Sequence, residues 1–489
     1  MTLDAAVCYR ALASRDARFD GRFFTGVTTT GVYCRPICPA RTPARGNVRF
    51  YGCAAAAEAD GFRPCRRCRP DTAPGTPAWQ GAPATVARGL RLIRDGALDE
   101  EGIDRFAARL GLGARQVRRL FEAHVGAPPA EIARTRRVHF ARALVDDPSL
   151  RLADIAFAAG FQSVRQFNHA FRQTFHAAPR ALRRSTRAQR APGDAGGVAL
   201  RLAFRPPFDL DWLMGLLAGR AAPGVERVEH GVYRRTVAIG GAAGWIEVRG
   251  FGGSGVRRSN ALAVRASPSL APHLLRVASG VRRVFDLDAD PAAIGRALSA
   301  DARLAKAVRA RPGLRVPGSW QPWEIALRAI VGQQVSVEAA TTIVGRIVAR
   351  AGAVVQTPFD GLTHLFPAPE AVAAADLSGI GMPGARVATV TRVAAGLADG
   401  TFRLEAAGGH DDTVRALCAI KGIGPWTAEY IALRALGEPD AFPAGDLGLR
   451  KALGEGTPVS AREAAEAAEV WRPWRGYAAM YLWSVKTED

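Results

Sequence analysis

Four cysteines near the amino terminus have the spacing of metal ligands. Three residues lie between Cys34 and Cys38, two lie between Cys65 and Cys68, and the 26 residues between the pairs allow the chain to fold back. This set suits tetrahedral zinc with four thiolate ligands. Four thiolates around one Zn²⁺ leave a net charge of about −2, so each sulfur stays nucleophilic at neutral pH without a general base. The pattern predicts a zinc site that is either purely structural or chemically reactive.

A second group of residues, near the carboxyl end, combines a glycine hairpin with one carboxylate. The string LCAIKGIGPWTAEYIALRAL, residues 417–436, predicts two apolar helices joined by a turn that contains Gly422 and Gly424. Glycine removes Cβ atoms where the N–H groups of a helix start meet a phosphate, a contact that the helix dipole favours. A lone turn of this kind is more often a plain link between helices. A DNA site is favoured by the string GQQVS at residues 332–336, by Asp446 and by Trp426, Tyr430 and Trp483.

These two groups must be held by separate domains, because 489 residues are too many for one hydrophobic core. Breaks rich in Pro and Gly occur at Pro70–Pro83, Arg187–Gly197 and Arg311–Gly318. They predict a multidomain chain with a small zinc domain at residues 1–78, an all-α domain at 84–187, an α+β domain at 197–311 and an all-α domain at 312–489. The α+β prediction rests on the alternating strings LRLAF, VYRRTVAIG, WIEVRG and ALAVRA, with helices near Asp211–Gly219 and Pro272–Phe285.

The first all-α segment contains two helix-turn-helix units in tandem. Apolar residues at helical spacing from Ile103 to Leu110 stop at Gly111 and resume at Val117, and the same pattern recurs about fifty residues later around Gly160. The outward positions of the last helix carry hydrogen-bonding side chains suited to base edges and phosphates. They are Arg165, Gln166, Asn168, His169 and Arg172. A solvated face on an ordinary bundle is the alternative, but two units in a basic segment favour DNA binding.

The charge of the chain indicates a polyanionic partner. The formal net charge is +21, and residues 1–190 hold 32 basic and 16 acidic residues, a net charge of +16. The positive charge is therefore concentrated in the first two-fifths. No 18-residue apolar run and no signal peptide opens the sequence, so we expect a soluble, cytoplasmic protein without a membrane partner. In such a chain, paired cysteines indicate metal before disulfide.

The residues around the cysteines resemble those of a known family. The strings TTGVYCRPICPAR, NVRFY and GFRPCRRCRPD are similar to the zinc domain of the Ada-type methylation sensor over essentially all of residues 1–75. In that family the first cysteine accepts a methyl group from a DNA methylphosphotriester while it stays bound to zinc. The resemblance gives this stoichiometric role to Cys34, and makes zinc ligands of Cys34, Cys38, Cys65 and Cys68. The string GFQSVRQFNHAFRQTF resembles the AraC-type DNA-binding domain.

Together the two resemblances imply a damage-activated transcription factor. The residues expected on DNA are Arg35, Arg45, Arg67, Arg165, Gln166 and His169. Turning one thiolate into a thioether changes the cluster charge from about −2 to about −1, which weakens repulsion of phosphates and favours promoter binding. The family's methyltransferase motif, Pro-Cys-His-Arg, is missing, because the only late cysteine is Cys418 in LCAIKG. Direct repair of O6-methylguanine is not expected.

The carboxyl half resembles the helix-hairpin-helix glycosylases, specifically 3-methyladenine glycosylase II of the AlkA type, across about residues 198–489. The strings LAFRPPFDLDWLMGLLAGRA and VFDLDADP match its α+β domain. A single Asp after the hairpin is catalytic in that family, which gives the role to Asp446. Breaking the bond between C1′ and an alkylated, cationic purine builds oxocarbenium character, which a carboxylate stabilises while it orients or deprotonates water. The target base must be flipped out and is expected to stack on Trp426, Tyr430 and Trp483.

Two positions refine this expectation. Bifunctional relatives carry a Schiff-base Lys just after the hairpin, where this chain has Trp426 after Pro425, so we expect a monofunctional enzyme. Lys421, before the hairpin, is expected to contact a phosphate or to be solvated. The family's intercalating apolar wedge corresponds to Gln334, a polar residue that fills the gap less well.

The sequence therefore predicts a fusion of sensor, regulator and glycosylase. It would excise 3-methyladenine and other alkylated bases and would activate transcription after methylation. The expected partners are double-stranded DNA, alkylated or promoter, and RNA polymerase, and the only expected cofactor is one Zn²⁺. One alternative is a transcription regulator whose glycosylase half merely grips DNA. Another is a DNA-binding scaffold with structural zinc only.

Overall fold

The computed structural model describes residues 4–74, 84–147, 150–183, 197–250, 260–405 and 410–485. The chain divides into two compact units. Unit 1 comprises Met1–Arg205, Phe251–Ser279 and Leu287–Ala289, and unit 2 comprises Pro206–Gly250, Gly280–Asp286 and Asp290–Asp489. The predicted breaks at Pro70–Pro83 and Arg187–Gly197 lie mostly outside the described residues. Within the described residues, no helix has the length and apolar character needed to cross a membrane.

Unit 1 begins with a small module built on a four-stranded sheet. The strands are β1 (Phe24–Val27), β2 (Val32–Cys34), β3 (Val48–Tyr51) and β4 (Arg63–Pro64), in the order β3-β1-β2-β4. β1 pairs antiparallel with β2 and β3, and β2 pairs parallel with β4. The helices are α1 (Ala5–Ala13), η1 (Ala17–Phe19), η2 (Arg45–Asn47), α2 (Ala54–Ala59) and η3 (Pro70–Thr72). The apolar clusters of this module are small, the largest holding Phe24, Tyr33 and Phe62 with two alanines.

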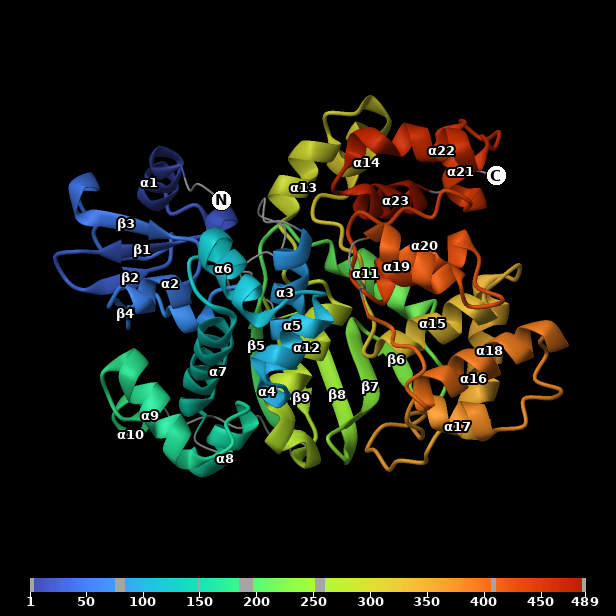
Figure 1. Cartoon of the computed structure of the whole chain (residues 1–489), viewed down its shortest axis with the longest axis horizontal. Helices are drawn as coiled ribbons and strands as arrows, with labels where there is room; N and C mark the ends of the chain where they lie inside the picture. Colours follow the sequence, from blue (N-terminus) through green and yellow to red (C-terminus); the bar gives the residue numbers. More distant parts are fainter. Residues whose placement is uncertain are drawn as a thin grey trace. The chain divides into compact units, whose positions relative to one another are not determined.

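The two predicted helix-turn-helix units are present in unit 1. The first is α5 (Ile103–Arg109) with α6 (Ala114–Val125), and the second is α8 (Leu152–Ala158) with α9 (Val164–Phe175). Gly111 and Gly160 make the turns with φ of +71° and +81°, values at which glycine carries no steric penalty. The remaining helices are α3 (Ala84–Arg94), α4 (Ala97–Glu100), α7 (Pro129–Val145) and α10 (Pro179–Leu182). The long helix α7 contacts both α8 and α9 (Figure 1).

A buried polar cluster joins the cysteine module to α7. Tyr33 Oη donates to Glu58 Oε1 over 2.9 Å, and Thr135 Oγ1 donates to Glu58 Oε2 over 2.9 Å. His139 Nε2 lies 2.9 Å from Glu58 Oε1 and 3.0 Å from Tyr33 Oη. Tyr33 immediately precedes Cys34, while Thr135 and His139 lie on α7. The strand that carries the first cysteine is therefore hydrogen-bonded, through one carboxylate, to the helix-turn-helix domain.

The α+β segment contributes strands to each unit. In unit 1, β5 (Val198–Ala203) pairs antiparallel with β9 (Ala261–Ala266), and η4 (Pro268–His273) follows. In unit 2, β6 (Glu226–Glu229), β7 (Val232–Ile239) and β8 (Ala242–Gly250) form an antiparallel meander preceded by α11 (Leu210–Ala218). α12 spans Leu274–Val284. These strands and helices confirm the predicted α+β segment. β6 was not predicted, because its sequence ERVE lacks an apolar alternation.

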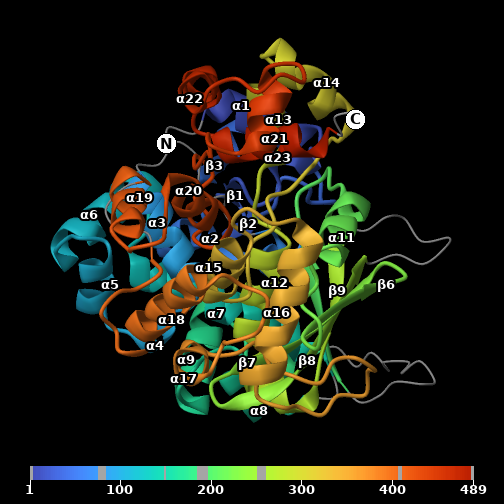
Figure 2. The same cartoon turned by 90° about the vertical axis from the view of Figure 1, so that its right-hand side faces the viewer.

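The rest of unit 2 is helical, as predicted. Its helices are α13 (Pro291–Leu298), α14 (Ala302–Ala310), α15 (Pro322–Val331), α16 (Val337–Ala351), α17 (Pro369–Ala374), α18 (Gly384–Ala398), α19 (His410–Cys418), α20 (Pro425–Arg434), α21 (Leu447–Leu453), α22 (Ala461–Ala468), η5 (Glu469–Trp471) and α23 (Arg475–Ser484). Buried apolar side chains of α15, α16, α18 and α20 form one core. α15 packs against α16, α18 and α20 (Figure 2), and α19, the hairpin and α20 form the predicted helix-hairpin-helix.

Candidate active site and zinc centre

Asp446 is the N-cap of α21, and three hydrogen bonds hold its carboxylate. Trp483 Nε1 donates to Oδ1 over 2.9 Å, and Trp426 Nε1 donates to Oδ2 over 3.0 Å. The backbone N–H of Leu449 also donates to Oδ1, over 3.0 Å. These donors come from α23, α20 and α21. The carboxylate therefore has one defined orientation, fixed by two indole side chains from different helices.

The three aromatic residues predicted to bind substrate lie together around this carboxylate. The rings of Trp426 and Tyr430 are stacked, with centroids 5.5 Å apart and an interplanar angle of 18°. Trp483 lies 6.3 Å from Tyr430, centroid to centroid. Arg434, one helical turn after Tyr430, donates to Tyr430 Oη over 3.0 Å and places its guanidinium 5.6 Å from the ring centre. Because Arg434 is buried, it fixes the Tyr430 ring from inside the domain.

Asp446 and these aromatic residues line a cavity of about 520 Å³. This volume falls within the range of small-molecule sites. Other walls come from Trp212 of α11, Trp320 before α15 and Val344 of α16, so the cavity lies between the α+β elements and the helices of unit 2. The cavity wall therefore combines aromatic side chains with the carboxylate of Asp446.

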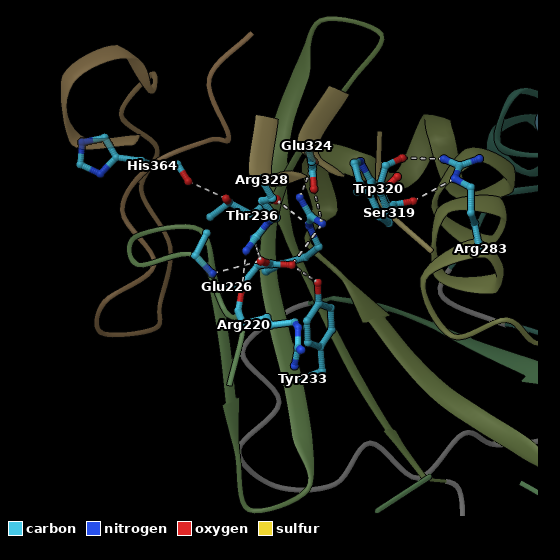
Figure 3. A network of polar contacts seen from close by, with 12 residues as sticks. Arg220, Glu226, Tyr233, Thr236, Arg283, Ser319, Trp320, Glu324, Arg328 and His364 are labelled. Atoms are coloured by element: carbon cyan, nitrogen blue, oxygen red, sulfur yellow. Dashed lines mark hydrogen bonds and ion pairs between the residues drawn. The ribbon is translucent and has the colours of Figure 1, made fainter. Parts of the chain in front are cut away.

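Figure 3 shows a network of polar contacts, and three of its labelled residues, Glu226, Glu324 and Arg328, also line the cavity. Arg235 of β7 makes two hydrogen bonds to Glu324 of α15, over 2.7 and 3.1 Å, and its guanidinium lies 5.2 Å from the Trp320 ring centre. Arg328 of α15 pairs with Glu226 of β6, which also accepts from Tyr233 Oη over 2.7 Å. These ion pairs connect the meander to α15. The guanidinium of Arg235 also packs on the Trp320 ring and holds it in place.

The pKa of Glu226 depends on its burial and on the two arginines near it. Burial alone would raise the pKa of this carboxyl, but the guanidinium groups of Arg328 and Arg235 outweigh it and leave the pKa below its usual value. Glu226 therefore stays ionised. Removing Arg235 would take away the ion pair of the buried Glu324, which is costly.

The hairpin has the geometry that its glycines predict. Gly422 has a φ of +97°, and a Cβ there would lie 2.2 Å from Thr389 Oγ1. Gly424 is the N-cap of α20, and among the described residues other than its chain neighbours, no atom lies within 4 Å of where its Cβ would be. The N-terminus of α20 is therefore exposed. The exposed Lys421 lies beside this turn, and its carbonyl oxygen accepts from Arg392 over 3.1 Å.

Sequence reasoning missed the role of Gln333. Its Nε2 donates to the carbonyl oxygen of Gly422 over 3.1 Å and to Thr427 Oγ1 over 3.0 Å. This side chain ties the GQQVS turn to the hairpin. The neighbouring Gln334 is exposed with a φ of +57°, at the tip of the turn. The next residue, Val335, is 37% exposed and lines the cavity, so the turn offers an apolar surface beside the polar wedge position.

The four cysteines meet in unit 1. The Sγ atoms of Cys34, Cys38, Cys65 and Cys68 all lie within 4.8 Å of one another. Four converging soft donors match the tetrahedral preference of zinc. Cys34 is partly exposed, whereas the other three are buried.

The remaining thiols have different surroundings. Burial raises the pKa of Cys53 to about 11, and burial together with the charge of Asp4 raises the pKa of Cys8 to about 11. Burial also raises the pKa of Cys418. These three thiols therefore stay protonated at neutral pH and are poor nucleophiles.

The arginines predicted to meet DNA from the zinc module differ in availability. Arg45 and Arg67 are exposed. Arg35 is largely buried, and its guanidinium pairs with Asp20 and donates to the Cys68 carbonyl oxygen over 3.2 Å. Its backbone N–H lies 3.4 Å from the Cys68 sulfur. Arg35 therefore contacts the cysteine cluster through Cys68, whereas Arg45 and Arg67 face solvent.

The second helix-turn-helix unit presents a polar face. Arg165, Gln166 and His169 on α9 are exposed, and Ser163 caps the helix by accepting from the Gln166 N–H over 3.2 Å. On the opposite face, Phe167, Phe171 and Phe175 are buried. The predicted DNA-reading side chains therefore share one accessible helix face.

Comparison with known proteins shows where this combination of parts occurs. Three family models match: the metal binding domain of Ada at residues 7–71, a helix-turn-helix domain at residues 106–185 and the AlkA N-terminal domain at residues 199–321. The probable bifunctional transcriptional activator/DNA repair enzyme AlkA of Mycobacterium tuberculosis is 45% identical over 482 residues, which cover 98% of this chain and 95% of that protein. The chain belongs to this AlkA-type bifunctional family.

Two relatives from Escherichia coli each match a part of this AlkA-type chain. DNA-3-methyladenine glycosylase 2 is 33% identical over 286 residues, 58% of this chain and 95% of that protein. The bifunctional transcriptional activator/DNA repair enzyme Ada is 36% identical over 121 residues, 25% of this chain and 33% of that protein. The predicted fusion of an Ada-like regulatory half with an AlkA-like glycosylase half is therefore confirmed, as are the predicted fold classes. The matched Ada domain and the cysteine cluster support one Zn²⁺.

Proposed function

We propose that unit 2 removes 3-methyladenine and other alkylated bases from double-stranded DNA by hydrolysis. The observation that carries this proposal is the Asp446 carboxylate, held by the indole N–H groups of Trp426 and Trp483 at the wall of an aromatic cavity. The family relationship to glycosylases supports it. The aromatic walls suit a flipped, positively charged base, because electron-rich ring faces attract cations.

The reaction follows from these positions. The bond between C1′ and the base nitrogen breaks, and its electron pair leaves with the base, whose positive charge is thereby neutralised. Asp446 stabilises the oxocarbenium character on the sugar. Water then forms the new bond to C1′, and its proton passes to Asp446 or to solvent. A leaving group that is already cationic needs no general acid, so one carboxylate, that of Asp446, is enough for the reaction.

Release of methylated bases without strand cleavage is the expected result for the wild-type protein. Position 426, directly after Pro425, holds Trp rather than an amine, so no Schiff-base nucleophile is offered there. Incubation with methylated duplex DNA, followed by chromatography of released bases, should show 3-methyladenine. Borohydride added during the reaction should trap no covalent protein–DNA complex. A trapped complex would contradict monofunctional hydrolysis, and no released base would refute the glycosylase proposal.

For unit 1, we propose that Cys34 accepts a methyl group from DNA methylphosphotriesters. Its place as the first cysteine of the four-sulfur cluster, in a segment that matches the metal binding domain of Ada, supports this role. The sulfur forms a bond to the methyl carbon, the carbon–oxygen bond of the ester breaks, and a phosphodiester anion leaves. The four ligands would hold zinc, which keeps the sulfur in its thiolate form. The thioether cannot return the methyl group, so the change is permanent.

Methylation of Cys34 is expected to strengthen promoter binding, because it removes about one negative charge from a surface that faces phosphates. After incubation with methylphosphotriester DNA, peptide mass spectrometry should place one methyl group on the peptide that contains Cys34. Gel-shift affinity for the cognate promoter should rise in parallel. Labelling mainly on Cys38, Cys65 or Cys68, or unchanged affinity, would overturn the electrostatic switch.

A further inference from the structure

The segment that carries Asp446 is anchored through Glu429, a residue that the sequence motifs do not single out. Glu429 lies on α20, one helical turn after Trp426. Its Oε2 accepts a hydrogen bond from the backbone N–H of Phe442 over 2.9 Å. Its Oε1 lies 3.1 Å from Nε2 of His410, the first residue of α19. One carboxylate therefore connects both helices of the helix-hairpin-helix to the start of the segment 442–446.

Both ends of this segment are fixed to the same helix. Glu429 holds the Phe442 N–H, and Trp426 Nε1 holds Asp446 Oδ2. Inside the segment, the Ala444 N–H donates to the Phe442 carbonyl oxygen and the Asp446 N–H donates to the Pro443 carbonyl oxygen, each over 2.8 Å. Such a short, internally bonded segment moves as one piece. Its orientation is set by its anchors, so a change at Phe442 is passed on to the carboxylate.

We propose that Glu429 is a positioning residue for Asp446, and that the charge on His410 holds Glu429 in place. This inference rests on the proposed glycosylase activity. Catalysis by a carboxylate depends on its placement, since an error of about 1 Å costs on the order of 100-fold in rate. Glu429 does not line the cavity, so its effect passes through the segment and not through contact with the base.

Several charged groups face His410. Burial lowers the pKa of this imidazole, but the hydrogen bond and charge of Glu429 outweigh burial and leave the pKa raised. Arg475 of α23 acts to lower the pKa, and Glu438, after α20, acts to raise it. Asp411 and Asp412 on α19 itself are exposed. A raised pKa means that the ion pair is complete at low pH and weakens as pH rises through the pKa of His410.

The test compares Glu429→Ala, Glu429→Gln and a matched control, Asp412→Ala, which removes an exposed ion pair with Arg415 on α19. The measurements are the single-turnover rate of 3-methyladenine release, affinity for abasic-site DNA, and thermal unfolding. Glu429→Ala should slow release about 10- to 100-fold while affinity stays within about twofold of wild type. Glu429→Gln should recover much of the rate, because its amide oxygen still accepts from the Phe442 N–H. The control should match wild type.

The pH dependence of the release rate distinguishes a positioning role of Glu429 from a purely structural one. The wild-type rate should fall as pH rises past the pKa of His410, and this fall should be absent in Glu429→Gln, whose neutral amide is not paired with a charge. Wild-type rates in both variants, or identical losses in Glu429→Gln and Glu429→Ala, would overturn the inference. If Glu429→Ala does not fold, the Gln variant and its pH profile still decide. An inactive wild-type protein would instead refute the proposed function.

Discussion

Replacing Asp446 by Asn should abolish most excision of 3-methyladenine while leaving the protein folded. Asparagine is as good an N-cap as aspartate, so its side-chain oxygen can keep the bond from the Leu449 N–H at the start of α21. The lost component is the negative charge that stabilises the oxocarbenium ion. Loss of one preorganised electrostatic group typically costs about 10²–10³-fold in rate. The loss here should be at least that large, because the other carboxylates that line the cavity, Glu226 and Glu324, are already paired with arginines.

The measurement is single-turnover release of 3-methyladenine, with binding to abasic-site DNA as the control. Affinity should change little, since Gly422, Gly424 and the aromatic walls are intact. The Asn amide group will face one of the two indole N–H donors, so thermal unfolding of the variant should be recorded beside that of wild type. If the folded variant releases 3-methyladenine at nearly the wild-type rate, the assignment of Asp446 as the catalytic carboxylate is wrong.

Asp446 could be grouped with the hairpin from sequence because the two are close along the chain, whereas the catalytic role of Asp446 is what the resemblance to the glycosylase family implies. Trp426, Tyr430 and Asp446 fall within about twenty residues, and helical spacing places the first two on one face of α20. Trp483, which the sequence analysis groups with Trp426 and Tyr430, is brought to the site from α23 by tertiary packing. That both indoles donate to the carboxylate could not be predicted, because side-chain rotamers decide it.

Other parts of the site are invisible to sequence reasoning. Glu429 and His410 look like solvated helix residues until α19 and α20 are packed, and Gln333 looks like a neighbour of the wedge position until its amide meets the hairpin. The buried pair of Arg235 and Glu324 links residues 89 positions apart. Charged residues are mostly exposed, so no local pattern marks those that pair inside a core.

Arg35 has partners within the protein in addition to the phosphate contact that the sequence predicts. Next to Cys34 in a basic segment, it is expected to contact a phosphate. In the structure its guanidinium is shared among Asp20, the Cys68 carbonyl oxygen and Thr72. We propose that Arg35 stabilises the cysteine cluster, and that the exposed Arg45 and Arg67 make the phosphate contacts. The sequence shows that a charged side chain is present at this position, but it does not show which group that side chain contacts.

Substituting Ser for Cys38, Cys65 or Cys68 should unfold the module formed by residues 4–74 and remove its zinc. The apolar clusters of this module are small, and modules of this size rarely fold without an additional link. Structural zinc contributes about 10–16 kcal/mol of apparent binding free energy in small domains, far more than such clusters supply. Elemental analysis should give one zinc per wild-type chain and none in the variants, and limited proteolysis should cut the module only in the variants or after chelation.

Unfolding of the module should also destabilise the DNA-binding domain, because the two share an apolar cluster and a polar cluster. Cys53 and Ala55 of the module pack with Phe121 and Val125 of α6, and Glu58 binds α7. Promoter affinity should therefore fall in the Ser variants, whereas Cys418→Ser, a change to a thiol outside the cluster, should leave zinc content and affinity unchanged. A module that stays protease-resistant with chelator present would show that packing against α6 and α7 suffices without metal, and the zinc would then serve the reactivity of Cys34 alone.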